Sequence, residues 1–240
     1  MATKYFSFSD VLGYGWRVMK ANFWFFVGLG LVWLIITYIP AIINDAVLPH
    51  LHLPPPIHIV LYTTITILSW VISIVLGIGM IKIALSFCDE RKPPIGMLFD
   101  AWGCFWRYLG TAILYFLIVF GGFILLIIPG IIWAIKFSLC FYFVIDKDLD
   151  PIEALKASSR TTMGVKLELF AFGILCSLIN ILGMLCLLVG IFAAYPVVIV
   201  ANALVYRQLM AQTPELAEFG ITGSDISANP NWARSPNEQE

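Results

Sequence analysis

A long apolar stretch near the C-terminus constrains this chain more than any other feature. The 44 residues from 167 to 210 carry only two charged side chains, Glu168 and Arg207. About 20 apolar residues are enough to cross the hydrocarbon of a bilayer as a helix, so this stretch is long enough for two crossings. We therefore predict an all-α polytopic membrane protein.

The composition of the whole chain agrees with this prediction. Of the 240 residues, 60% are hydrophobic and 12% are charged, against about 25% charged in ordinary soluble domains. Lys and Arg number 14 and Asp and Glu number 15, which leaves a formal net charge of −1. These values exclude a disordered chain, a small disulfide scaffold and a nucleic-acid-binding domain, so we expect no nucleic-acid partner.

Four apolar stretches together have the length for six membrane-spanning helices. They cover residues 22–43, 59–87, 109–145 and 167–210. The third contains Pro129-Gly130, a turn signal that predicts a bend between two helices. In the fourth, Gly183 or Gly190 is expected to mark the turn. The six spans are thus predicted to form three hairpins within a membrane domain of residues 1–210.

The positions of the basic residues predict the orientation of these spans. The loop 44–58 contains no Lys or Arg, whereas basic residues precede the first span and follow the second, fourth and sixth. Cytoplasmic loops carry the excess of Lys and Arg in membrane proteins. With six spans, every basic cluster falls on one side of the membrane. We therefore expect a protein of the inner (plasma) membrane with both termini in the cytoplasm.

The membrane domain contains a weak threefold repeat, with units at 6–88, 95–146 and 151–210. Each unit begins with a segment of mixed polarity in which an arginine follows an acid after seven positions. The pairs are Asp10 and Arg17, Asp100 and Arg107, and Glu153 and Arg160. Each segment is expected to form a cytoplasmic interfacial amphipathic helix ahead of its hairpin.

Two interpretations of these acid–arginine pairs remain open. Seven residues span about 10 Å along a helix, so the two members of a pair do not easily reach each other. They form ion pairs between units in the first interpretation, as a ring on the cytoplasmic side. In the second, acids occupy the first turn and arginines the last because of the helix dipole. We favour the second, because the dipole alone predicts this order.

Lys136 is the most unusual charge, because it lies inside an apolar stretch. An ammonium group in hydrocarbon is costly, so a functional interpretation places a lipid headgroup phosphate or an anionic substrate beside it, with Asn180 and Asn202 as helpers. In the structural interpretation, which we favour, Lys136 reaches the outer interface or caps carbonyls freed by Pro129. Asn180 and Asn202 would then hydrogen-bond to each other between helices.

The remaining polar features are the predicted external loop and the C-terminal tail. His50, His52 and His58 lie in that loop, but they lack the fixed spacing of a metal site, so we expect neither a metal nor a cofactor. Residues 211–240 are rich in Pro, Ser and Asn and carry five acids against one arginine. They are predicted to be a disordered cytoplasmic tail.

The second half of the chain carries a set of short motifs at 109–209. The motifs are Ile128-Pro129-Gly130-Ile131, Lys136-Phe137-Ser138, Asp146, Glu153-Ala154-Leu155, Ser158-Ser159, Met163-Gly164, Leu169-Phe170, Leu182-Gly183, Pro196 and Tyr206-Arg207. As a set they resemble a family of bacterial multi-span membrane proteins that includes the membrane domain associated with some glycerophosphodiester phosphodiesterases and related uncharacterised envelope proteins. The resemblance implies a six-span architecture. It implies no phosphodiesterase activity, since the catalytic barrel is missing from this chain.

From these features we expect a non-enzymatic inner-membrane protein. It would act as a scaffold or accessory subunit through contacts with membrane lipids, with another membrane protein or with a second copy of itself. The alternative is a small transporter or lipid-handling permease with Lys136 near its site. A cavity that reaches Lys136 would favour this alternative, and a tightly packed bundle would favour the scaffold.

Overall fold

The computed structural model describes residues 4–51, 54–99, 102–185 and 187–221, and all secondary structure in these ranges is helical. Six helical stretches there are long and apolar enough to cross a membrane, which confirms the predicted number. They are Phe23–Leu51, Pro55–Cys88, Ile95–Leu125, Ile127–Lys147, Lys166–Leu185 and Phe192–Ala211. The predicted all-helical class is therefore confirmed, and the six helices are compatible with a multi-pass membrane protein.

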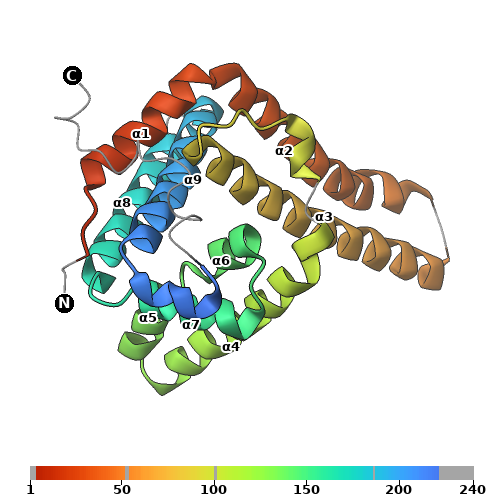
Figure 1. The fold of residues 1–240 in the computed structure, drawn as a ribbon. Coiled ribbons are helices and arrows are strands. Elements are labelled where there is room, and N and C mark those ends of the chain that lie inside the picture. Colours follow the sequence, from red (N-terminus) through yellow and green to blue (C-terminus); the bar gives the residue numbers. More distant parts are fainter. Residues whose placement is uncertain (1–3, 52–53, 100–101, 186, 222–240) are drawn as a thin grey trace.

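The first part of the chain forms a bent pair of helices that leads into the longest helix. The elements are α1 (Phe8–Ala21), α2 (Phe23–Ile42), the short helices η1 (Ile43–Val47) and η2 (Leu48–Leu51), and α3 (Pro55–Cys88). The Ser7 side chain caps the start of α1, as its position before an acid predicts. Figure 1 shows α2 and α3 side by side, extending away from the other helices.

The middle part contains two helices that pack against each other, followed by a break. It contains η3 (Ile95–Leu98), η4 (Trp102–Cys104), α4 (Phe105–Leu125), α5 (Ile127–Lys136) and α6 (Cys140–Lys147). The turn between α4 and α5 lies at Leu126, whose backbone is extended, so the prediction of a bend at Pro129-Gly130 was wrong. Pro129 lies in the first turn of α5, where a helix does not need the missing N–H group.

The last part contains α7 (Pro151–Thr161), α8 (Lys166–Leu185), α9 (Leu187–Ala211) and η5 (Pro214–Phe219). We predicted a turn at Gly183 or Gly190, but α8 ends after Gly183 and α9 begins before Gly190. A Cβ atom on Gly183 would lie 2.7 Å from the Cβ of Ala194 and 2.9 Å from the Gly190 carbonyl oxygen. This glycine therefore allows α8 and α9 to approach closely.

Two other predicted boundaries need correction. The segment 95–108 was expected to be one interfacial helix, but it forms η3, η4 and the start of α4 instead. The predicted disordered tail is ordered at its beginning, because η5 packs with Leu216 fully buried and Ile221 nearly so. Apolar anchors at these two positions outweigh the polar composition of 211–221. Residues 222–240 lie outside the described part.

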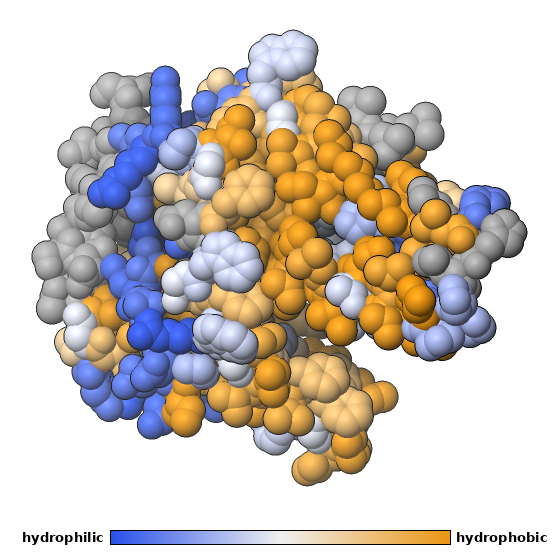
Figure 2. All heavy atoms as spheres, turned by 90° about the vertical axis from the view of Figure 1, so that its right-hand side faces the viewer, coloured by the Kyte–Doolittle hydropathy of each residue, from blue (hydrophilic) through white to orange (hydrophobic). Residues whose placement is uncertain are grey.

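The core is gathered around α9, against which α1, α3 and α8 all pack (Figure 1). Its largest fully buried side chains include Tyr206, Phe143, Leu209 and Met210. Large apolar side chains are exposed instead on α2, α4 and α8, and Figure 2 shows a broad hydrophobic surface beside a hydrophilic margin. Such a surface is expected where hydrocarbon surrounds a protein.

Candidate functional site

A buried cluster of charged side chains joins three helices at their C-terminal ends. Arg207 near the end of α9 meets Asp146 in the last turn of α6 and Asp89 just after α3. The guanidinium donates to Asp146 through Nη1 to Oδ2 at 2.7 Å and through Nη2 to Oδ1 at 2.9 Å. Its Nη2 also donates to Asp89 Oδ2 at 2.8 Å. We call this group, with Tyr206 and Lys147, the Arg207 cluster.

The local packing shields the Arg207 cluster. The Arg207 residue is only 6% exposed, and the hydroxyl of the buried Tyr206 donates to Asp146 Oδ2 at 3.0 Å. The Tyr206 ring stacks on Tyr142 and meets Phe143 edge-on, with ring centroids 5.3 and 5.0 Å apart. These rings keep water from the ion pair, which strengthens its electrostatic attraction.

The charges within the cluster balance. Lys147 Nζ lies 3.6 Å from Asp146 Oδ2, so two cations face the two carboxylates of Asp89 and Asp146. A planar guanidinium suits bidentate binding of a carboxylate better than an ammonium group does. The geometry is that of an ion-pair network that links α3, α6 and α9, since the arginine binds both carboxylates.

Our sequence analysis did not predict the Arg207 cluster as a site, although a signal was present. Asp146, Tyr206 and Arg207 belong to the motifs of the resemblance, and Arg207 was used to orient the last span. A charged residue inside an apolar span needs a partner, and acids at the ends of other spans are the natural candidates. Which acids meet Arg207 could not be predicted, because Asp146 and Asp89 lie 61 and 118 positions away.

A second polar junction holds the break in the fourth span, where Lys136 lies. The hydroxyls of Ser158 and Thr162 each donate to the Lys136 carbonyl at 3.0 Å, and the Leu139 N–H donates to Ser158 Oγ at 3.2 Å. The Lys136 ammonium lies 5.1 Å from the centroid of the Phe137 ring. The backbone groups left without helical partners between α5 and α6 are thus satisfied by α7 and the residue after it.

This junction conflicts with the predicted position of Lys136. The segment that forms α7 was predicted on the cytoplasmic face and Lys136 at the outer interface. At most one of these two predictions can be right, because the end of α7 contacts the backbone of Lys136. The physical reason is the break between α5 and α6, which prevents the fourth span from running straight across from residue 127 to residue 147.

Asn180 and Asn202 bond mainly within their own helices. Asn180 Nδ2 donates to the Cys176 carbonyl at 3.1 Å, and Asn202 Nδ2 donates to the Val198 carbonyl at 2.8 Å. Asn202 Nδ2 also lies 4.0 Å from Cys176 Sγ, which links α9 to α8. The hydrogen bonds among the described residues bring neither amide to Lys136. A shared anion-binding site of Lys136, Asn180 and Asn202 therefore stays a prediction.

Two of the three arginines, Arg107 and Arg160, have partners other than those of the predicted ring. Arg107 contacts Asp148 and lies 3.4 Å from Asp150, whereas Arg160 contacts Glu218 in η5. These ion pairs involve partly exposed side chains, for which the stabilisation is small. Asp100 lies outside the described residues, so the pairings that involve it stay a prediction.

The helix-dipole interpretation has a structural counterpart in the first and the third unit. Asp10 lies in the first turn of α1, which carries Arg17 towards its other end. Glu153 lies in the first turn of α7 and Arg160 in its last turn. Acids near a helix N-terminus and bases near its C-terminus interact favourably with the backbone dipole. The placement in α7 is the one that this interpretation requires.

The N-terminal segment is tied to the ends of α7 and α9. Lys4 Nζ donates to the carbonyls of Arg160 and Thr161 at 2.7 and 3.1 Å. Two hydrogen bonds of 2.7 and 2.8 Å join the backbone of Tyr5 to the side chain of Gln212. Burial lowers the pKa of Lys4, while Glu215 acts in the opposite direction. Segments far apart in sequence therefore meet on one side of the molecule.

The predicted histidine loop is only partly described, since His52 lies outside the described residues. Among the residues that the structure describes, no group of three or more His, Cys, Asp or Glu side chains is arranged to hold a metal ion.

Comparison with known proteins does not assign the chain to a family. No family model, no curated protein and no solved structure matches it. The arguments on function therefore rest on the residues and on their geometry.

Proposed function

We propose that this chain is a non-enzymatic integral protein of the inner (plasma) membrane that acts as a scaffold or accessory subunit. It would act through contacts with membrane lipids and with another membrane protein or a second copy of itself. One observation carries this proposal: buried charges fasten the helices together at the Arg207 cluster, while large apolar side chains on α2 and α4 point outwards.

We further propose that the six spans form three hairpins with both termini in the cytoplasm. In support, α2 packs against α3, α4 against α5 and α8 against α9. The contacts of Lys4 with the end of α7 and of Tyr5 with Gln212 join the two ends of the described chain. Six crossings bring both ends of the membrane domain to the same side of a bilayer, and the basic residues assign that side to the cytoplasm.

The family resemblance is a further proposal. Three of the residues that carry it, Asp146, Tyr206 and Arg207, meet in the Arg207 cluster. Related chains with the same helix arrangement would need these residues to hold their helices together. This supports a relationship in architecture.

The transporter alternative receives less support. The Lys136 carbonyl is bonded to Ser158 and Thr162, and its ammonium lies over the Phe137 ring. These contacts explain the position of Lys136 by packing, without a bound substrate. A flux of solute or lipid catalysed by the purified protein in proteoliposomes would restore this alternative.

Two measurements test the proposed function. Compartment-specific reporters fused to each terminus should both report the cytoplasm, and reporters on opposite sides would contradict the three-hairpin topology. A photo-crosslinking residue at the exposed Phe116 of α4 should trap phospholipid or a discrete membrane protein in native membranes, whereas the same residue at the buried Leu209 should not. Equal crosslinking from both positions would contradict a role based on outward contacts.

A further inference from the structure

The most informative unassigned feature is an apolar groove between α2, α3 and α9. It has a volume of about 210 Å³, and its lining is contributed by ten residues. They are Phe26, Leu29, Gly30, Trp33, Leu34, Tyr38, Met80, Phe192, Tyr195 and Pro196. None of these side chains carries a charge, so the groove suits a hydrocarbon chain and no polar solute.

The groove has a buried floor and an exposed rim. Phe26, Leu29 and Met80 on the floor are almost completely buried, whereas Trp33 and Tyr195 on the rim are 41% and 44% exposed. The groove therefore opens towards the surroundings of the protein, which are lipid in the proposed membrane position. A single acyl chain could enter it from the side.

The length of the groove matches one leaflet of a bilayer. Its lining on α2 runs from Phe26 to Tyr38, which are 12 residues apart and therefore separated by about 18 Å along the helix. The hydrocarbon core of a bilayer is about 30 Å thick, so one leaflet is about half of that. An acyl chain that lies along α2 would therefore fill the groove from one end to the other.

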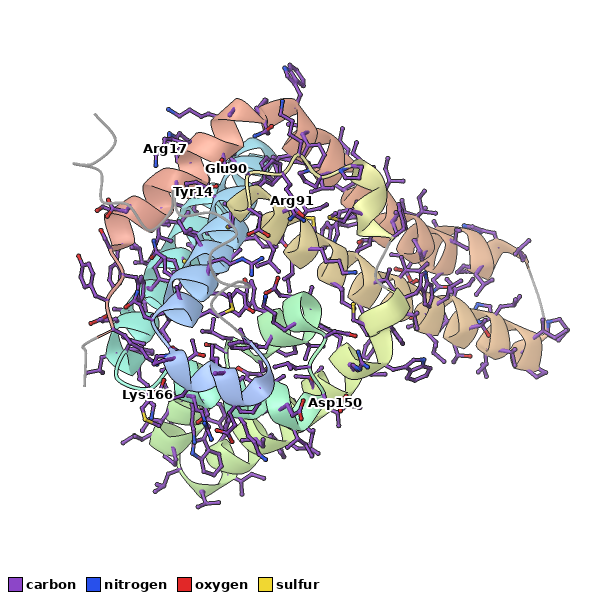
Figure 3. The ribbon with its side chains drawn as sticks, viewed as in Figure 1. Tyr14, Arg17, Glu90, Arg91, Asp150 and Lys166 are labelled. Carbon is purple, nitrogen blue, oxygen red and sulfur yellow. The ribbon has the colours of Figure 1, made fainter. Side chains whose placement is uncertain are left out.

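The Phe26 end of the groove lies close to a group of basic side chains. The Phe26 ring is 5.2 Å from that of Phe87, whose carbonyl accepts a 2.8 Å hydrogen bond from the Tyr14 hydroxyl of α1. Figure 3 shows Tyr14 and Arg17 on α1 close to Glu90, which follows α3, while Arg91 lies farther along, over α3. These contacts connect the groove to the charged surface at the junction of α1, α2 and α3.

Positive charge prevails at this junction. Arg17, Lys20, Arg91 and Lys92 are all exposed there, while the two nearby acids are Glu90 and Asp89, the latter bound by Arg207. The exposed Trp16, over which Lys20 lies at 5.1 Å, is of the type that prefers the headgroup level of a membrane. Lys20 precedes Phe26 by six residues, across the break at Asn22 between α1 and α2, so the end of α1 adjoins the Phe26 end of the groove.

From this combination we propose that the chain binds one anionic phospholipid of the cytoplasmic leaflet. One acyl chain lies in the groove from Phe26 to Tyr38, and the headgroup phosphate lies beside Arg17 and Lys20. The apolar lining selects a hydrocarbon chain, and the excess of basic residues selects an anionic headgroup over a zwitterionic one. This inference rests on the lipid contact in the proposed function and gives it a site and a lipid class.

Native mass spectrometry of the full chain tests the groove. The protein is released from vesicles of equal parts phosphatidylglycerol and phosphatidylcholine, and retained lipid is counted. The unchanged protein should retain one phosphatidylglycerol. Leu34→Trp fills the groove and should lower retention at least tenfold, whereas Leu34→Ala keeps it open. Leu31→Trp places the same side chain on an exposed site of α2 outside the lining, so it should retain lipid normally.

A second pair of variants tests the headgroup site. The double variant Arg17→Gln, Lys20→Gln should retain both lipids equally, because the preference for the anionic headgroup is lost. Lys156→Gln, at an exposed position of α7, is the matched control and should keep the preference. These exposed residues leave the fold intact, so this pair gives a result even where Leu34→Trp fails to fold.

The outcomes separate this site from the broader function. Equal retention by Leu34→Trp and Leu31→Trp, or an unchanged lipid preference in the double variant, would overturn the groove and its headgroup site. If the terminal reporters and Phe116 crosslinks still behave as expected, the scaffold function stands without it. Reporters on opposite sides of the membrane would instead overturn the membrane placement on which both proposals depend.

Discussion

Both halves of α3 are largely apolar, yet they have opposite surroundings. In the first half, Ile59 and Ile67 are 61% and 64% exposed, whereas in the second half Leu76 and Ile78 are completely buried. Hydropathy therefore predicts that a helix is removed from water. It does not predict whether lipid or protein surrounds the helix. The distinction comes from features of the second half: Gly79, which lets η3 approach, and Asp89, which engages Arg207.

The two halves also differ in what holds them. The second half ends at the Arg207 cluster, and Cys88 Sγ lies 3.9 Å from the Val200 carbonyl of α9. The first half is joined to η1, which follows α2, by Asn44 Nδ2, which donates to Thr66 Oγ1 at 3.1 Å. An ion-pair network thus lies at the C-terminal end of α3, and a hydrogen bond between two neutral side chains lies in its first half. The following variants test whether the stability of the protein depends mainly on the contacts of the second half of α3.

The largest effect is expected from Arg207→Met. It leaves the carboxylates of Asp89 and Asp146, whose side chains are only 18% and 12% exposed, without the guanidinium, so we expect a loss of about 3–5 kcal/mol in the free energy of unfolding. Reversible unfolding in mixed micelles measures the change, with the exposed Lys156→Met as control. Adding Asp89→Asn and Asp146→Asn should recover much of the loss, and no recovery would contradict the electrostatic explanation.

The next largest effect separates the two halves directly. Leu76→Ala removes contacts within the protein and should destabilise it by about 2–4 kcal/mol through the cavity that it leaves. Leu68→Ala, at a position that is 57% exposed, should have little effect because lipid or detergent refills the space. The same unfolding measurement applies to both variants. Equal losses would mean that the first half of α3 is also packed against protein.

A smaller effect is expected from a glycine of α3 in the buried half. A Cβ atom on Gly79 would lie 2.5 Å from the Leu98 carbonyl oxygen, and a backbone atom cannot move aside easily. Gly79→Ala should therefore cost about 1–3 kcal/mol by overpacking. Gly77 has no atom within 4 Å of the corresponding position, so Gly77→Ala should be neutral or stabilising by up to about 1 kcal/mol. Thermal midpoints that shift in the same direction would contradict the close approach of η3.

The smallest effect concerns the Tyr206 hydroxyl. Tyr206→Phe removes one hydrogen bond to Asp146, whose oxygens still accept from Arg207, so the expected loss is about 1 kcal/mol. Tyr142→Phe keeps the stacked ring of the neighbouring position and serves as the control. A loss for Tyr206→Phe as large as that for Arg207→Met would show that the hydroxyl, rather than the guanidinium, holds the cluster together.

Some features of the site were accessible from sequence and others were not. The acid of the first turn and the arginine of the last turn in α7 follow from the order of Glu153 and Arg160 along the chain. The turns were misplaced at Pro129 and Gly183, because proline is tolerated in a first helical turn and glycine also serves close helix packing. Local residue types allow both uses, and only the neighbouring helix distinguishes them.

By itself, the sequence determined that the chain forms six helices long and apolar enough to cross a membrane, because hydropathy and length are summed over consecutive residues. Only the tertiary structure decided that Arg207 meets Asp146 and Asp89, and which half of α3 is buried. These outcomes depend on contacts between residues far apart in the chain. Lipid and protein interior are almost equally apolar, so a residue's own character does not select between them.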